Sequence, residues 1–253
     1  MMRMLAIAVL MFAAVPAPAG IYSPTANSPF EFGPDGKPKA LWPTQFDELY
    51  NDRIDTMNPA TPKERAKTRV ETLKRIEERK AQAAPPNPEF ALAQSADLLA
   101  VGQTAEAIKL LRGFDTPGDF RLQANTVQAH ALSFDWLSAM ENELYPKEAE
   151  ASAVTPELRW RFSIEKQYTR IWLRYHLDLV RKKTDPATLK PIPLFGDGPL
   201  PAEAVAIAQQ MALDAPTDNY LLWALAETNA KAGDYRTAAK LFDRCTNLSL
   251  IHI

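Results

Sequence analysis

The fold is decided by residues 216–245, which read PTDNYLLWALAETNAKAGDYRTAAKLFDRC. In the first half, four residues recur at steps of three and four and therefore share one face of a helix: Leu222, Leu225, Ala226 and Asn229. The second half repeats this spacing with another four: Ala238, Leu241, Phe242 and Cys245. Between them, Gly233 can adopt the left-handed backbone that closes a helix, and Asp234 can accept hydrogen bonds from the amides of the next one. The stretch predicts two amphipathic helices folded back antiparallel, with small Ala226 and Ala238 at their crossing and Phe242 filling the space beside it.

This pattern resembles the tetratricopeptide repeat (TPR), a helix pair of about 34 residues with the order large-x2-Leu-small-x2-aromatic, Gly, Ala-x3-Phe and Pro. Pro216 stands where the proline of a preceding repeat would lie, whereas Leu222 and Asn229 replace the usual Trp and aromatic residue. A looser match over residues 90–113 carries the same series: Ser95, Leu98, Gly102, Ala107 and Leu111. The resemblance implies an all-α, TPR-like solenoid of antiparallel helix pairs over residues 63–245, irregular because the two matches are not a whole number of repeats apart. Another kind of helical bundle is the alternative.

Residues 1–19 have the composition of a secretory signal peptide. Arg3 gives a positive start, residues 5–15 are apolar, and small residues at Ala17 and Ala19 surround the expected cleavage site. The apolar run is shorter than the roughly 20 residues that a membrane span needs. We therefore expect export to the periplasm or the extracellular space, with no stable membrane span after cleavage; an uncleaved anchor is the alternative.

The remaining composition sets limits on partners. A formal net charge of −2 over 253 residues gives no basis for a nucleic-acid partner. The single cysteine, Cys245, cannot form an internal disulfide and is expected to be a buried structural thiol. Residues 246–253 contain neither the closing proline nor a polar capping helix, so we expect a non-native or truncated tail and a chain that is a fragment.

Between these ends, the chain divides at its prolines. Residues 20–62 are expected to be a Pro-rich linker or strap. After Pro43, a short helix with Phe46, Leu49, Tyr50 and Ile54 at helical spacing is expected to dock onto the body together with Trp42. A charged helix is expected over residues 63–82, opened by a capping box and carrying a narrow apolar stripe. The capping box is Thr61, Pro62 and Glu64, and the stripe is Ala66, Val70, Leu73 and Ile76.

Two further segments are helical by periodicity. Residues 119–144 suit either one long helix or a pair broken near Ser133. Residues 155–183 are expected to form the longest helix, capped by Thr155 and with a broad apolar and aromatic face. Its other side carries five arginines: Arg159, Arg161, Arg170, Arg174 and Arg181.

No catalytic motif is found in the sequence. The chain has no His-Glu-x-x-His, Cys-x-x-Cys, phosphate-binding Gly-rich loop or Gly-x-Ser-x-Gly elbow. His130 and His176 fall in expected helices without a second ligand-like residue one turn away. We therefore expect no catalytic residue, no metal site, no cofactor and no enzymatic activity.

The residues expected to bind a partner lie on the first helix of the 216–245 pair. The TPR resemblance implies that this helix lines a groove for a protein or peptide through the side chains outside its packing face: Tyr220, Trp223, Glu227 and Lys231. Packing of Trp223 in the core is the competing interpretation. The function expected is a non-catalytic interaction scaffold of the periplasm or cell envelope.

Two alternative functions remain open. Arg170, Trp172 and Arg174 could form a site for an acidic or carbohydrate ligand, since guanidinium groups bind carboxylates and aromatic rings stack on sugars and cations. The chain could also be a helical accessory part of a truncated, larger enzyme.

Overall fold

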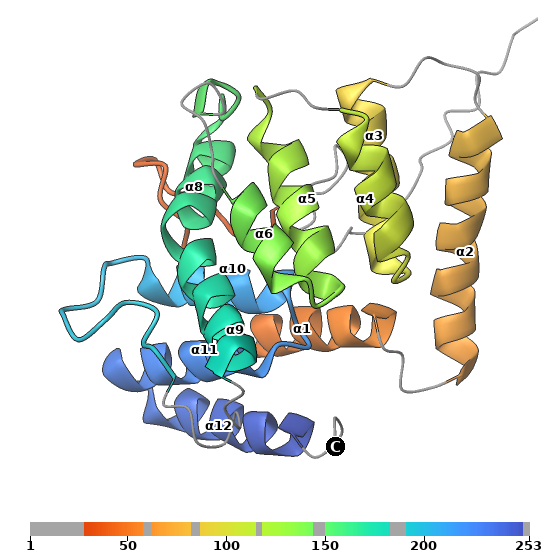
Figure 1. The fold of residues 1–253 in the computed structure, drawn as a ribbon. Helices are drawn as coiled ribbons and strands as arrows, with labels where there is room; N and C mark the ends of the chain where they lie inside the picture. Colours follow the sequence, from red (N-terminus) through yellow and green to blue (C-terminus); the bar gives the residue numbers. More distant parts are fainter. Residues whose placement is uncertain are drawn as a thin grey trace, which may run out of the picture.

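The computed structural model describes residues 28–57, 62–81, 87–114, 118–143, 150–182 and 191–249, and it is all-helical over these ranges (Figure 1). The one strand-like pairing that they contain is an isolated bridge between Phe32 and Pro38. The predicted all-α class is therefore confirmed. The expected signal peptide, Thr61 and the side chains of Pro62 and Glu64 in the expected capping box, and residues 250–253 of the expected tail lie outside the described parts.

The helices in chain order are α1 (Pro43–Met57), α2 (Pro62–Ala81), α3 (Pro88–Ala100), α4 (Thr104–Arg112), α5 (Phe120–Leu132), α6 (Trp136–Asn142), α8 (Pro156–Ile164), a π-helical turn η1 (Glu165–Thr169), α9 (Arg170–Lys182), α10 (Ala204–Asp214), α11 (Asn219–Lys231) and α12 (Tyr235–Ser249). None of them combines the length and apolar composition that a membrane span requires. Several begin where a side chain accepts a hydrogen bond from a backbone N–H of the first turn: Asn87, Asp119, Asp135, Thr155 and Asp218.

Residues 216–245 form the predicted hairpin. α11 and α12 pack against each other, Gly233 has a φ of 88°, and Asp234 accepts from the amide of Thr237. The packing faces are buried, including Leu222, Ala226 and Ala238. The expectation for Phe242 is wrong, because this ring is 38% exposed. α12 lies at the outer edge of the bundle (Figure 1), and Phe242 is on a side of it that the described helices leave open. α12 also continues to Ser249, beyond the expected end of the repeat at Cys245.

The looser match at residues 90–113 also folds as a hairpin, made of α3 and α4. Gly102 has a φ of 78° at the turn, and the residues of the matched series are buried on the helix faces that meet: Ser95, Leu98, Ala107 and Leu111. Residues 119–144 resolve into a third pair, α5 and α6, broken at residues 133–135. In this turn Phe134 has a positive φ of 60°, and its side chain is 79% exposed.

The helix expected over residues 155–183 is continuous but not uniform. The π-helical turn η1 separates α8 from α9 and holds one more residue per turn than an α-helix. The broad apolar face is confirmed at Phe162, Ile164 and Trp172. Arg161, expected on the solvent side with the other arginines, is instead only 6% exposed. As one continuous helix over residues 156–182, the segment is longer than α2, which has 20 residues, as expected; counted without the π-helical turn, α8 and α9 are each shorter than α2.

Residues 28–57 lie along the helical body as a strap. Phe30 and Phe32 contact the ring of Trp160 edge-on, at 5.2 and 5.6 Å between ring centroids. Phe46 and Tyr50 of α1 are buried in the core as expected, and the Tyr50 hydroxyl donates to the carbonyl of Pro216 at 2.6 Å. Trp42 does not dock, because 74% of it is exposed.

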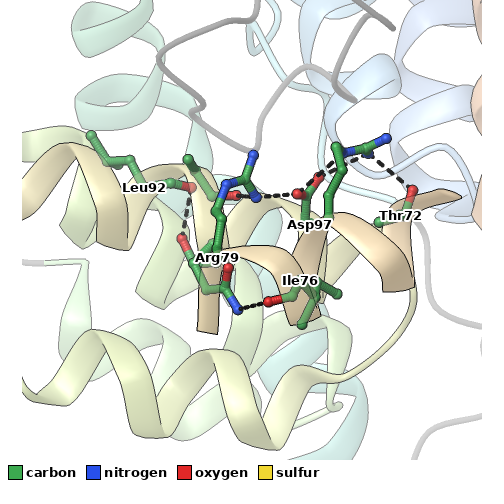
Figure 2. A network of polar contacts seen from close by, with 9 residues as sticks. Thr72, Ile76, Arg79, Leu92 and Asp97 are labelled. Atoms are coloured by element: carbon green, nitrogen blue, oxygen red, sulfur yellow. Dashed lines mark hydrogen bonds and ion pairs between the residues drawn. The ribbon is translucent and has the colours of Figure 1, made fainter. Parts of the chain in front are cut away.

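α2 is held on the bundle mainly by polar contacts. Asp97 of α3 forms ion pairs with Arg75 and Arg79 of α2, and Arg75 also donates to Thr72 (Figure 2). The carboxylate of Asp97 thus holds two guanidinium groups of α2, and Arg69, more than one turn toward the N-terminus, donates to the carbonyl of Val101 at 2.8 Å. Of the expected apolar stripe, Ile76 is buried and Leu73 packs against the same cluster, but Val70 is 60% exposed; the side chain of Ala66 lies outside the described parts.

Candidate partner-binding face

The four residues expected to line a groove on α11 share one face, but only Lys231 is exposed, and Trp223 and Glu227 are half-buried. Tyr220 is only 4% exposed, and Trp223 is partly buried against the core. Glu227 and Lys231 form an ion pair of 3.0 Å. The expectation that Tyr220 is free for a partner is wrong, because another segment of the chain already lies against it.

That segment is residues 191–196, with the sequence Pro-Ile-Pro-Leu-Phe-Gly, which we call the covering segment. The Tyr220 hydroxyl donates to the carbonyl of Ile192 at 2.8 Å, and Nζ of Lys231 donates to the carbonyl of Gly196 at 2.9 Å. Leu194 is 2% exposed, and the ring of Phe195 meets Tyr168 edge-on with centroids 5.2 Å apart. The residues that it contacts, together with Trp223 and Glu227 beside them on α11, form what we call the covered face: Tyr168, Tyr220, Trp223, Glu227 and Lys231.

Stacked aromatic rings support the covered face. Tyr220 stacks on Tyr175 of α9 with centroids 4.3 Å apart, and Trp223 stacks on Tyr220 at 6.2 Å. Burial, together with the nearby carboxylate of Asp218, raises the pKa of Tyr220 far above its usual range. The hydroxyl therefore stays protonated and remains a hydrogen-bond donor over the whole physiological pH range.

A cavity of about 580 Å³ adjoins the covering segment on the side of α9. One wall is helical and includes Ile171, Arg174 and Asp178, and the other is the covering segment with Pro201. Ile192 at its edge is 43% exposed. The lining thus combines aliphatic and aromatic side chains with one cation and one anion, a mixture suited to a polypeptide more than to a small anion.

The alternative ligand set is not brought together. Trp172 is 5% exposed, and its indole N–H donates to Asp218 at 2.9 Å on the core side of α9. Arg170 is exposed and lies 3.7 Å from the carboxylate of Glu143. Arg174 lines the cavity described above. A site formed jointly by Arg170, Trp172 and Arg174 is therefore excluded by this geometry.

The sequence analysis missed a second cavity, of about 570 Å³, where the start of α1 faces α10, α11 and α12. The Gln209 side chain fixes one edge by exchanging two hydrogen bonds with the backbone of Leu41, at 2.8 and 3.0 Å. Arg244 bridges to Asp47 at 3.0 Å across it. Asn229, which stands where the repeat pattern has an aromatic residue, lines this cavity, so a residue smaller than the usual ring leaves room there.

The ionisable groups in the interior have structural partners. His130 Nδ1 lies 3.3 Å from Asp135, and His176 Nε2 lies 2.7 Å from Asp218. Among the described residues, no group of three or more His, Cys, Asp or Glu side chains is placed to hold a metal ion. Burial raises the pKa of Cys245 to about 11, so the thiol is a poor nucleophile near neutral pH.

A buried polar cluster lies where α1, α8, η1 and α10 meet. Burial and the neighbouring Glu165 raise the pKa of Asp214 to about 7, against the opposing effect of Arg161 and Arg53. Beside it is a void of about 10 Å³, bordered by Gln128, Thr169 and the two acids. This volume is close to that of one water molecule, so the cluster has no room for a substrate.

In comparisons with known proteins, no protein-family model, curated protein or solved structure matches this chain. Function is therefore inferred from the geometry of the chain itself.

Proposed function

We propose that this protein is a non-catalytic scaffold that binds a segment of another polypeptide on the covered face and in the adjoining cavity. The observation that carries the proposal is the covering segment itself. Tyr220 and Lys231 hold it through backbone carbonyls, which every polypeptide has, while Leu194 fills an apolar site. A surface that accepts a turn of its own chain in this way has the chemistry to accept one from a partner.

A TPR-like organisation is part of the same proposal. In three helix pairs the first helix ends with the same backbone bond, in which the third residue after the helix donates to a carbonyl five residues earlier: Gln103 to Leu98, Asp135 to His130 and Asp234 to Asn229. In each turn the residue before the donor has a positive φ: Gly102, Phe134 and Gly233. Phe134 follows Gly102 by about one TPR length of roughly 34 residues, whereas Gly233 is not a whole number of lengths from Gly102. This recurrence supports an array of related pairs.

Residues 1–19 support the proposal that the scaffold acts in the periplasm or outside the cell. Mass spectrometry of the mature protein tests this directly, since cleavage before Gly20 is expected. A mature chain that retains residues 1–19 would contradict it.

The scaffold proposal is tested by panning random peptides against the full chain and measuring the affinity of selected peptides in solution. Ile171→Ala and Arg174→Ala, on the wall of the cavity, are expected to weaken binding at least roughly tenfold if these are contact residues. The control is Val70→Ala, which removes an exposed aliphatic side chain on α2, away from the cavity. Failure to recover any peptide that binds in solution would overturn the proposal.

A further inference from the structure

The covering segment has a defined conformation. The amide of Gly196 donates to the carbonyl of Pro193 at 3.1 Å, which closes a four-residue turn over Pro-Leu-Phe-Gly. Gly196 has a φ of 64°, a left-handed conformation that other residues adopt only with strain. The turn presents Leu194 to the core and Phe195 to Tyr168. The conformation of this turn therefore depends on having a glycine at position 196.

The covering segment is held by few contacts that depend on its own sequence. The two bonds from Tyr220 and Lys231 go to carbonyls and would form with any chain in the same conformation. Only Leu194 and Phe195 provide side-chain contacts that select a sequence. Ile192, Gly196 and Gly198 are exposed on the outer side, so that a competing chain can approach from solvent and from the adjoining cavity.

We propose that the covering segment is a built-in competitor, and that the partner of this face is a polypeptide carrying an apolar-Pro-Leu-aromatic-Gly turn that replaces it. The inference rests on the proposed function of the covered face. A tethered competitor reduces the apparent affinity for the partner by the fraction of molecules in which the face is free. Loosening the covering segment therefore raises the affinity for an external copy of the same turn.

A glycine pair provides a mild test. Gly196→Ala strains the turn without a steric clash, because an added Cβ meets no atom within 4 Å. Gly198→Ala is the matched control, since its Cβ also meets no atom within 4 Å and its φ is not in the left-handed region. The probe is a fluorescein-labelled peptide of residues 191–198, followed by fluorescence polarisation with the full chain. Gly196→Ala is expected to bind it roughly fivefold more tightly than wild type, and Gly198→Ala is expected to match wild type.

A second variant, Leu194→Ala with Phe195→Ala, removes the anchoring side chains, and its helicity is checked by circular dichroism. It is expected to bind the probe at least as tightly as Gly196→Ala does. A probe in which the same Leu and Phe are replaced by Ala is expected not to bind. Equal affinity of wild type, Gly196→Ala and Gly198→Ala would overturn the built-in competitor.

The two proposals fail in different ways. If panned peptides bind the covered face but the 191–198 probe does not compete with them, the inference is wrong and the scaffold proposal stands. If neither the panned peptides nor the probe binds wild type or the loosened variants, both are wrong.

Discussion

The indole N–H of Trp172 donates to Oδ2 of Asp218 at 2.9 Å. The other carboxylate oxygen of Asp218 accepts from the amides of Tyr220 and Leu221, at 2.9 and 3.2 Å, and so caps α11. One carboxylate therefore both starts the decisive hairpin and joins it to α9. Burial alone would raise the pKa of Asp218, but His176 and these hydrogen bonds outweigh burial and lower it.

Replacement of Asp218 by Ala is expected to reduce the free energy of unfolding by about 2–4 kcal/mol. The helix loses its cap, which is worth about 1 kcal/mol, and the buried indole N–H loses its acceptor, which costs about 1–3 kcal/mol. Trp172→Phe removes only the donor and is expected to have the smaller effect. Urea unfolding at pH 7 measures both, and a change below about 0.5 kcal/mol for Asp218→Ala would contradict the double role.

The three equivalent turns predict substitutions of opposite sign. Gly233→Ala forces a side chain into a left-handed backbone of φ 88° and is expected to destabilise by about 1–2 kcal/mol, with no steric contribution because its Cβ meets no atom within 4 Å. Phe134→Gly relieves the same strain and is expected to stabilise by about 1 kcal/mol, since the ring is 79% exposed. Thermal unfolding of both variants measures these effects, and Gly118→Ala, at a glycine without a positive φ, is the control. If Phe134→Gly destabilises the protein, the ring contact of Phe134 with Trp136 contributes more to stability than the backbone strain costs.

A buried glutamate predicts a pH effect on stability. Burial and the nearby Glu165 raise the pKa of Glu143 to about 7, and Arg170 only partly opposes them. Because the folded state holds this proton more tightly than the unfolded chain, the stabilising contribution is complete below about pH 4.5 and is lost as the pH rises to about 7.

Glu143→Gln keeps the shape of the side chain and removes the titration. At pH 8 it is expected to be about 1–3 kcal/mol more stable than wild type, and at pH 4 the two are expected to be equal. Chemical unfolding across this range measures the difference. Parallel pH profiles for the two proteins would show that Glu143 does not titrate as stated.

The ion-pair cluster of α2 predicts a local effect. Asp97→Asn leaves Arg75 and Arg79 without their carboxylate, so amide hydrogen exchange in residues 69–81 is expected to speed up while α11 is unchanged. Glu78→Gln breaks an exposed pair with Lys74 and is expected to have little effect. Uniformly faster exchange over the whole chain would instead indicate a global loss of stability.

The hairpin geometry was predictable because residues 216–245 combine three local signals. Helical spacing, a glycine at the turn and a capping Asp234 all act within the pair and do not depend on the rest of the chain. The strap helix after Pro43 was predictable for the same reason, since Phe46 and Tyr50 share a face and both are buried. Trp42 was not, because its position outside the helix gives it no periodicity to interpret.

Other features were not predicted from local pattern. Phe134 occupies a turn position where glycine is favoured, so the sequence could not decide between one long helix over residues 119–144 and the pair α5–α6 that is observed. Arg161 is buried although it was grouped with the exposed arginines; nine residues separate it from Arg170, which places the two on opposite sides of a regular helix, so the grouping was wrong at the level of spacing. The covering segment contacts Tyr220 and Lys231, which lie 28 and 35 residues further along the chain. Burial of Tyr220 therefore results from a tertiary contact that no local sequence pattern indicates.

The docking of α1 also determines when the fold can be completed. Its contacts connect Leu41 with Gln209, Tyr50 with Pro216 and Arg53 with Leu213, pairs separated by 168, 166 and 160 residues. At a synthesis rate of roughly 5–20 residues per second, these partners leave the ribosome about 8–30 s after α1 does. Although each hairpin can close locally as it emerges, α1 must wait undocked until α10 and the start of α11 have been made. Docking of α1 is therefore a late step that depends on long-range contacts, whereas each helix pair forms from contacts that are local in sequence.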